Sequence, residues 1–181
     1  MKKRILTWLL AISMLGSLLT VPAGAAAVTK FSDVSDSYTA TAVEALRLMG
    51  VLDGYGDGTF RPDTILNRAQ FCKMAVYAMD GSGELGRYST VTIFPDVKHS
   101  HWASAYINMA ARKGIISGFA DGKFKPGQTV TAGQAVTILM RGLGYKDEDM
   151  GGVWPQSYMA EAQTNGLLKS TGITSAYAGL T

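Results

Sequence analysis

The stretch GYGDGTFRPD, residues 54–63, recurs with few changes as GFADGKFKPG, residues 118–127. Glycine adopts backbone angles that strain other residues, aspartate side chains accept hydrogen bonds from nearby amides in Asx turns, and proline ends a helix. One aromatic residue in each stretch, Phe60 or Phe124, is expected to be buried beneath the loop. The motif therefore predicts a tight loop that orients the segments on either side of it.

The similarity extends beyond these loops, so the chain is a tandem repeat. FSDV at 31–34 matches FPDV at 94–97, and a third copy begins where residues 154–168 align with residues 102–116. The final pair, Leu180–Thr181, corresponds to the pair just before the second helix of copy two. The sequence therefore predicts two full copies and a third that stops before its second helix, as in a fragment or a truncated gene model.

Each copy is expected to fold as helix, loop and helix. The first helix of copy one is predicted from Tyr38 to Met49, and Gly50 follows it because glycine suits the left-handed turn after a helix. The second helices follow Asn67 and Thr131, which are good N-caps, and a glutamine three residues further on completes a capping box. Apolar residues recur along the first helix at a spacing of three and four: Tyr38, Ala42, Ala45, Leu46 and Met49.

The amino-terminal segment has the features of a secretory signal peptide. Lys2, Lys3 and Arg4 precede an apolar run, and small residues follow it at 21–28, which predicts a signal peptide over residues 1–27. A retained membrane anchor is the alternative, but a run of about 15 apolar residues is shorter than the ~20 that a spanning helix needs. Without this segment the chain has 14 basic and 14 acidic residues, so its charge does not indicate nucleic-acid binding.

The residues favour neither an enzyme nor a metal site. The single cysteine, Cys72, lies in a helical pattern and is predicted to be a small buried side chain rather than a nucleophile. The loop sequence DGYGDG resembles a calcium loop, but Tyr55 and Thr64 stand where an EF-hand needs ligands at positions 3 and 12. The aspartates of this loop crowd one turn, whereas a glycosidase needs two carboxylates across a cleft. We therefore expect no catalytic residues, no metal and no cofactor.

The ordered motifs resemble those of the S-layer homology (SLH) module. They are F-x-D-V, an aromatic residue at the start of a helix, G-[IV]-[IL]-x-G-x-x-D-G-x-F-x-P, and a capped second helix. The resemblance covers residues 31–145 well and residues 154–181 in part. It implies a mainly α fold in which tandem helix-loop-helix repeats assemble into a pseudo-trimeric, three-pronged bundle. The expected modules are residues 28–90, residues 91–146 and a partial third module at 147–181.

The resemblance also implies a function. SLH modules anchor secreted proteins at the cell surface, in the cell wall or S-layer, without catalysis. The implied partner is an acidic, commonly pyruvylated, secondary cell-wall polysaccharide or a peptidoglycan-linked glycan. Two alternatives stay open: an S-layer lattice or scaffold component that acts mainly through protein contacts, and the anchor of a longer envelope hydrolase. A cargo domain beyond the carboxyl end of this chain is also possible.

The family's binding motif falls on residues 67–70, which implies that Arg68 and Gln70 belong to a ligand site. A guanidinium beside free amides at a helix N-terminus suits an anion, although an arginine on a solvated helix is the alternative. Copy two has Ala132 in place of the arginine, so one anion site is expected. Because the grooves of this family lie between modules, Trp102 is expected to stack on a sugar ring, or else to pack in the core. Further expected contacts are Asp96 and Gly118, with Trp154 as the counterpart of Trp102 in copy three.

Overall fold

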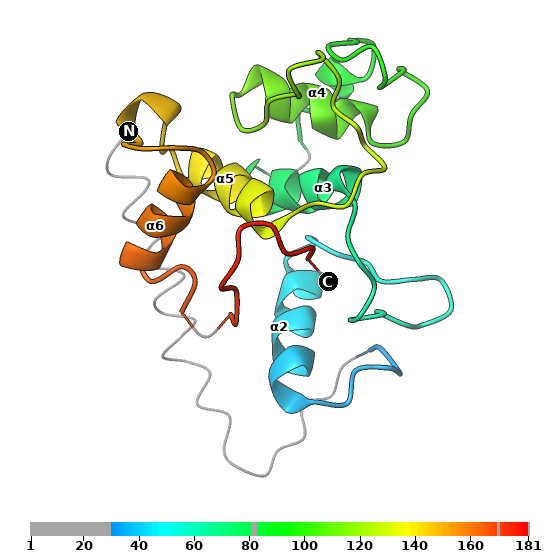
Figure 1. The fold of residues 1–181 in the computed structure, drawn as a ribbon. Helices are drawn as coiled ribbons and strands as arrows, with labels where there is room; N and C mark the ends of the chain where they lie inside the picture. Colours follow the sequence, from blue (N-terminus) through cyan, green and yellow to red (C-terminus); the bar gives the residue numbers. More distant parts are fainter. Residues whose placement is uncertain (1–29, 81–82, 170, 181) are drawn as a thin grey trace.

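The computed structural model describes residues 30–80, 83–169 and 171–180, and the predicted signal peptide lies outside them. Within these residues the protein is helical and contains no strand, which confirms the mainly α prediction (Figure 1). The described part of the chain contains no helix long and apolar enough to cross a bilayer. The elements are α2 (Ser37–Leu48), α3 (Arg68–Asp80), η1 (Leu85–Tyr88), α4 (Ser104–Arg112), α5 (Ala132–Gly142), η2 (Asp147–Asp149) and α6 (Gln156–Thr164).

The ends of the helices follow from their local sequence. Asn67 and Gln70 exchange two hydrogen bonds of 2.9 Å at the start of α3, and Thr131 forms the same capping box with its glutamine at α5. Gly50 and Gly114 end α2 and α4 in the left-handed region, at φ +73° and +70°. In both, the glycine amide and the next amide donate to carbonyls of the last turn, as in a Schellman motif. The predicted capping boxes and glycine ends are confirmed.

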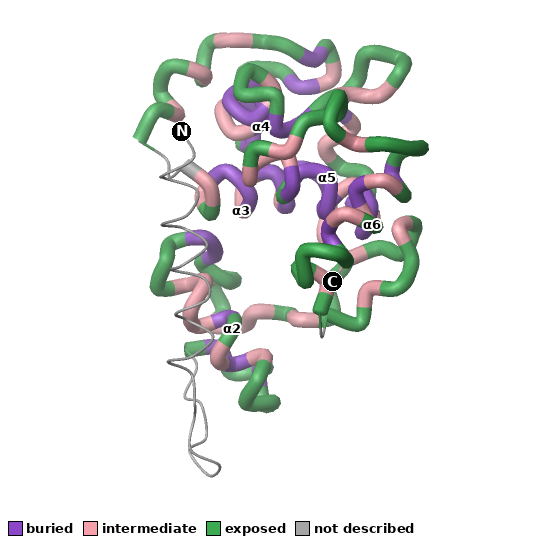
Figure 2. Tube along the Cα trace, turned by 90° about the vertical axis from the view of Figure 1, so that its left-hand side faces the viewer, coloured by how far each residue is buried: buried purple, intermediate pink, exposed green. Residues whose placement is uncertain are grey.

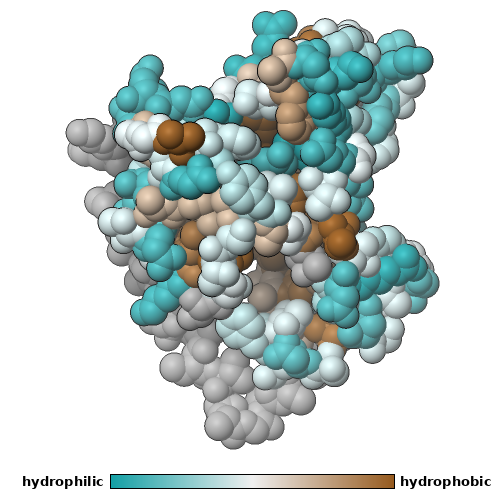
Figure 3. All heavy atoms as spheres, viewed as in Figure 1, coloured by the Kyte–Doolittle hydropathy of each residue, from teal (hydrophilic) through white to brown (hydrophobic). Residues whose placement is uncertain are grey.

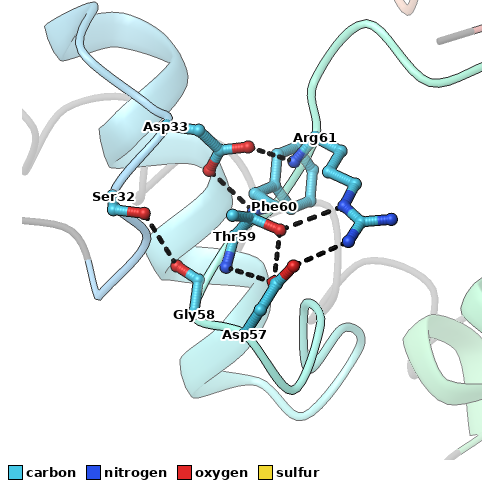
Figure 4. A network of polar contacts seen from close by, with 7 residues as sticks. All are labelled: Ser32, Asp33, Asp57, Gly58, Thr59, Phe60 and Arg61. Carbon is cyan, nitrogen blue, oxygen red and sulfur yellow. Dashed lines mark hydrogen bonds and ion pairs between the residues drawn. The ribbon is translucent and has the colours of Figure 1, made fainter.

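The two glycine loops are held by the aspartate of the F-x-D-V motif. The Asp33 carboxylate accepts hydrogen bonds from the amides of Phe60 and Arg61 at 2.7 and 2.6 Å (Figure 4). Asp96 accepts the same pair of bonds from Phe124 and the residue after it, at 2.9 and 2.7 Å. Phe124 is fully buried and Phe60 is partly buried, as predicted. Each aspartate therefore fastens the start of its module to the far end of its own loop.

A left-handed, non-glycine residue occupies the same position of both loops. Arg61 has φ +61° and Lys125 has φ +58°, a region that costs energy for residues with a Cβ. Each amide is bonded to the aspartate described above, and each side chain forms an ion pair with Asp57 or Asp121 at 2.7 or 3.0 Å. These contacts hold the backbone in its strained conformation.

The second helix of each copy packs against the first helix of the next copy. The helix α3 packs against α4, α5 packs against α6, and α3 meets α5 at the centre of the molecule (Figure 1). Residues buried along α3, α4 and α5 form the main core (Figure 2). Cys72 is among them, and burial raises the pKa of its thiol to about 12, which agrees with an inert core residue.

The helix α2 contacts no other helix among the described residues and packs on its own module. Its buried residues are Ala40 and Val43, which face Phe31 and Leu52. The predicted stripe is therefore wrong at its ends, since Tyr38 is 75% and Met49 is 56% exposed. Figure 3 shows hydrophobic residues (brown) bordering the hollow between the α2 part and the rest of the molecule.

Three equivalent backbone segments meet in a closed ring of hydrogen bonds. The amide of Leu66 donates to the carbonyl of Leu180 at 2.8 Å, and Leu180 donates to Val130 at 3.2 Å. Val130 in turn donates to Leu66 at 3.0 Å. The three residues occupy the same position in the three copies, so the ring lies on a pseudo-threefold axis. The predicted pseudo-trimeric arrangement is confirmed.

The start of each second helix is covered by the loop of the following copy. The amides of Arg68 and Ala69 donate to the carbonyls of Gln128 and Pro126 at 2.9 and 3.0 Å. At α5 the first two amides donate to the carbonyls of residues 178 and 176 at 2.8 and 2.7 Å. Helix starts normally leave four amides without a partner inside the helix. Here the neighbouring copy satisfies two of them.

We expect Asp96→Ala to lower the free energy of unfolding by about 1–3 kcal/mol, because two loop amides lose their charged acceptor. Urea unfolding followed by circular dichroism measures this change. Asp63→Ala is the control, since Asp63 is exposed and forms no side-chain hydrogen bond or ion pair in the described chain; it should change stability by no more than about 0.5 kcal/mol. Equal effects of the two substitutions would contradict the role of Asp96.

Acid should remove the contribution of Asp57. Hydrogen bonds from Thr59 and from Arg61 lower the pKa of Asp57 to about 2, from 3.8. A lowered folded-state pKa means that the stabilisation is complete above pH 3.8 and is lost as the pH falls towards 2. The difference in melting temperature between the wild type and Asp57→Ala should therefore shrink over that interval. A difference independent of pH between 5 and 2 would contradict this assignment.

Candidate functional site

Two grooves lie between neighbouring copies, in equivalent positions. Groove 1, with a volume of about 400 Å³, is bounded by the copy-two loop at 116–120, by α5, and by the segment from Trp154 to Tyr158. Groove 2, with a volume of about 450 Å³, is bounded by the copy-one loop at 51–55, by α3, and by Trp102. These volumes are in the usual range for ligand sites.

Arg68 lies on the floor of groove 1 and reaches it from the start of α3. Its residue surface is 5% exposed, so the alternative of a solvated arginine is wrong. Its Nε donates to the carbonyl of Phe124 at 2.8 Å, and its Nη1 donates to Oε1 of Gln134 at 3.1 Å. A longer bond of 3.5 Å joins Nη2 to the carbonyl of Ser117. All of these partners belong to copy two.

The Arg68 guanidinium has no carboxylate partner among the described residues. Its central carbon lies 4.7 and 4.5 Å from the ring centres of Phe119 and Phe124, and burial lowers the pKa of Arg68. Arginine nevertheless stays charged in proteins. Neutral acceptors satisfy part of its hydrogen-bonding capacity but leave its charge uncompensated. The site therefore favours an anionic group that enters the groove.

The amides at the start of α3 do not contribute to such a site. Arg68 and Ala69 donate to copy-two carbonyls, and the next two amides donate to the side chain and the carbonyl of Asn67. The expectation of free amides beside the guanidinium is therefore wrong. Any anion in groove 1 is recognised by side chains and not by the end of this helix.

The five predicted site residues fall in different places. Arg68 and Gly118 line groove 1, whereas Gln70 and Trp102 line groove 2. Asp96 lines neither groove, and its carboxylate holds two amides of the copy-two loop. The Oε1 of Gln70 is bonded to the amide of the α3 N-cap. The structure thus divides four of the five into two pairs, one in each groove, and leaves Asp96 outside both.

The two tryptophans lie at equivalent edges of the two grooves. Trp102 is 56% exposed, so the alternative of a core residue is wrong for it, and Trp154 is 52% exposed. The indole of Trp154 donates to the hydroxyl of Thr137 at 3.0 Å, which orients its ring at groove 1. Of the two tryptophans, the one that shares a groove with Arg68 is therefore Trp154, from copy three.

Sequence reasoning missed a second cation in groove 1. Arg141 forms a two-bond pair with Asp147 at 2.8 and 2.7 Å, and Tyr158 donates to the same carboxylate. The Tyr158 bond and the Arg141 bonds lower the pKa of Asp147, so it stays ionised. Aligning the repeats places Arg141 opposite Tyr77 of copy one, on the face of α5 that carries Gln134. The presence of arginine in copy two, where copy one has Tyr77, was the sequence signal that could have revealed this cation.

Groove 2 has different chemistry. Lys73 takes the place of Thr137 and lies 3.4 Å from the Asp53 carboxylate. No described arginine occupies the position that Arg68 has in groove 1. Ala132 is buried and lines neither groove. Among the described residues, no three His, Cys, Asp or Glu side chains come together as metal ligands.

Comparison with known proteins identifies the family. Residues 30–72 and 93–136 match the model of the S-layer homology domain. A cell surface protein of Thermoanaerobacter kivui is 38% identical over 160 residues, which are 87% of this chain and 20% of that protein. The middle cell wall protein of Brevibacillus brevis is 32% identical over 146 residues, 80% of this chain and 14% of the relative. The cellulosome-anchoring protein of Acetivibrio thermocellus is 31% identical over 115 residues, 62% of this chain and 26% of the relative.

The pseudo-threefold helical repeat with grooves between its copies is thus that of a modular cell-surface protein. The chain belongs to the S-layer homology domain family. It spans 14–26% of the length of these three relatives. Their names, and the family, support a surface-anchoring module of a secreted cell-surface protein.

Gly118→Ala should distort groove 1. An added Cβ would lie 2.7 Å from Cε1 of Phe94 and 2.9 Å from the carbonyl of Lys123, so the loop must shift. We expect a loss of about 1–3 kcal/mol in unfolding free energy. Gly56→Ala is a matched control, because its Cβ meets nothing within 4 Å and copy two has Ala120 there. Thermal unfolding of both variants checks this, and equal stability of the two would contradict it.

Proposed function

We propose that the protein is a non-catalytic anchor that binds an acidic cell-wall polysaccharide in groove 1. The observation that carries the proposal is the buried Arg68 guanidinium, which has no described carboxylate partner and lies at the base of an open groove. A pyruvate ketal on a sugar supplies a carboxylate for this charge. The family and a cellulosome-anchoring relative support attachment at the cell surface.

Other residues of groove 1 suit the remainder of a sugar. The exposed face of Trp154 offers an apolar surface for the C–H side of a pyranose ring. The hydroxyl of Ser157 and the Gln134 side chain line the same groove and provide hydrogen-bonding groups for sugar hydroxyls. Gly118 shapes the wall of the groove, because the absence of a side chain lets the loop pass close to Phe94 and the carbonyl of Lys123.

In groove 2 we propose a weaker, neutral sugar contact. Trp102 presents a half-exposed ring, and Gln70 and Lys73 line the groove beside it. The Lys73 charge lies opposite Asp53, so this groove holds no uncompensated buried cation among its described residues.

Asp96 contributes indirectly to groove 1, because it fixes the loop whose carbonyl at Phe124 accepts a hydrogen bond from Arg68.

A second candidate is a surface-lattice or scaffold component that acts mainly through protein contacts. The exposed apolar residues Tyr38 and Leu48 of α2, and Met49 directly after it, favour this function. The two functions differ in what they require. Polysaccharide binding depends on Arg68, whereas lattice contacts through α2 do not.

Retention on cell-wall polysaccharide tests the proposal. Arg68→Gln should weaken binding to purified, pyruvylated wall polysaccharide about tenfold or more, because a charge-assisted hydrogen bond is worth about 1.5–3 kcal/mol. Isothermal titration calorimetry measures it, with circular dichroism to confirm folding. Arg87→Gln is the control, since the Arg87 side chain is 79% exposed and lies in η1, outside both grooves. Binding that is indifferent to Arg68→Gln would favour the lattice function.

A further inference from the structure

Ser117 lies between two guanidinium groups. Its carbonyl accepts the Arg68 Nη2 bond of 3.5 Å, and its hydroxyl accepts a bond of 3.2 Å from Nη1 of Arg141. The two arginines come from the second helices of different copies, and both line groove 1. A single residue of the copy-two loop therefore holds two cations at the same groove.

The two cations differ in how their charges are compensated. Arg68 is buried and has no carboxylate partner among the described residues, whereas Arg141 is paired with Asp147. The Asp147 side chain is 68% exposed, and the Arg141 side chain is 13% exposed. The charged residues that line groove 1 in the described chain are these three, so the groove has a net charge of +1. An exposed carboxylate is the member of the pair that a ligand anion can displace most easily.

We propose that Arg141 is a second specificity-determining residue of groove 1, and that the groove selects a glycan with two acidic groups. This inference rests on the proposed function, because it assumes that one acidic group occupies Arg68. The second acidic group binds Arg141 in competition with Asp147. Asp147 and Ser117 hold the guanidinium in place until the ligand arrives. A ligand with one acidic group uses Arg68 alone.

Two probes and four variants, Arg68→Gln among them, test the inference. The probes are purified, pyruvylated wall polysaccharide and a methyl glycoside that carries a single pyruvate ketal. Arg141→Gln should weaken polysaccharide binding about tenfold and leave the affinity for the monoanionic glycoside unchanged. Asp147→Asn removes the competing carboxylate and should bind the polysaccharide at least as tightly as the wild type. Arg87→Gln is again the control, and calorimetry with a thermal unfolding curve is recorded for each protein.

If the ion pair between Arg141 and Asp147 is purely structural, the affinities of the variants should change differently. If Arg141 only supports the fold, Arg141→Gln and Asp147→Asn should lose affinity together, and that result would overturn the inference. Polysaccharide binding by Arg141→Gln equal to that of Arg87→Gln would also overturn it, as would an equal loss for both probes. If Arg68→Gln loses binding while Arg141→Gln does not, only the present inference fails. If the wild type binds neither probe, the proposed function fails with it.

Discussion

The ring of backbone hydrogen bonds among Leu66, Val130 and Leu180 is the constraint on which the arrangement depends. It fixes the ends of three loops around one axis, and the loops of copies two and three then cover the starts of α3 and α5. The second helices start at the axis and diverge from it, so each of α3 and α5 packs on the first helix of the next copy. The grooves lie where a loop of one copy, its second helix and the next copy come together. Each groove therefore exists only where the copies are assembled.

The same arrangement explains where the charge of groove 1 comes from. Loop carbonyls of the next copy cover the first amides of α3 and α5, so the positive ends of these helices are not open to a ligand. A side chain must carry the charge to the groove instead. Arg68 does so from the first position of α3, where it passes beneath the copy-two loop and is held by the carbonyls of Phe124 and Ser117. Its burial follows from the contact between copies.

The sequence predicted features that depend on neighbouring residues and missed those that depend on the axis. The capping box of Asn67 and the left-handed Gly50 are local, and both were predicted correctly. The choice of Trp154 over Trp102 as the companion of Arg68 depends on which copies meet, which periodicity does not reveal. The prediction of a buried stripe along α2 was wrong at its ends for the same reason. The spacing of apolar residues indicates an apolar face but does not say whether another element covers it. Arg141 could be noticed in the sequence only because it differs from Tyr77, the equivalent residue of copy one.

Mutual capping of the helices has a consequence for how such a chain can change in length. In a linear solenoid each repeat contacts only its neighbours, so a whole unit can be added or removed with modest effect. In this molecule copies two and three each supply the loop carbonyls that cover the start of the preceding second helix. Each also supplies a first helix that packs against that same second helix, and one residue of the central ring. Deleting the residues of copy two would expose the start of α3 and leave α6 without α5. The copies are alike in sequence, yet each depends on contacts with the others for its structure.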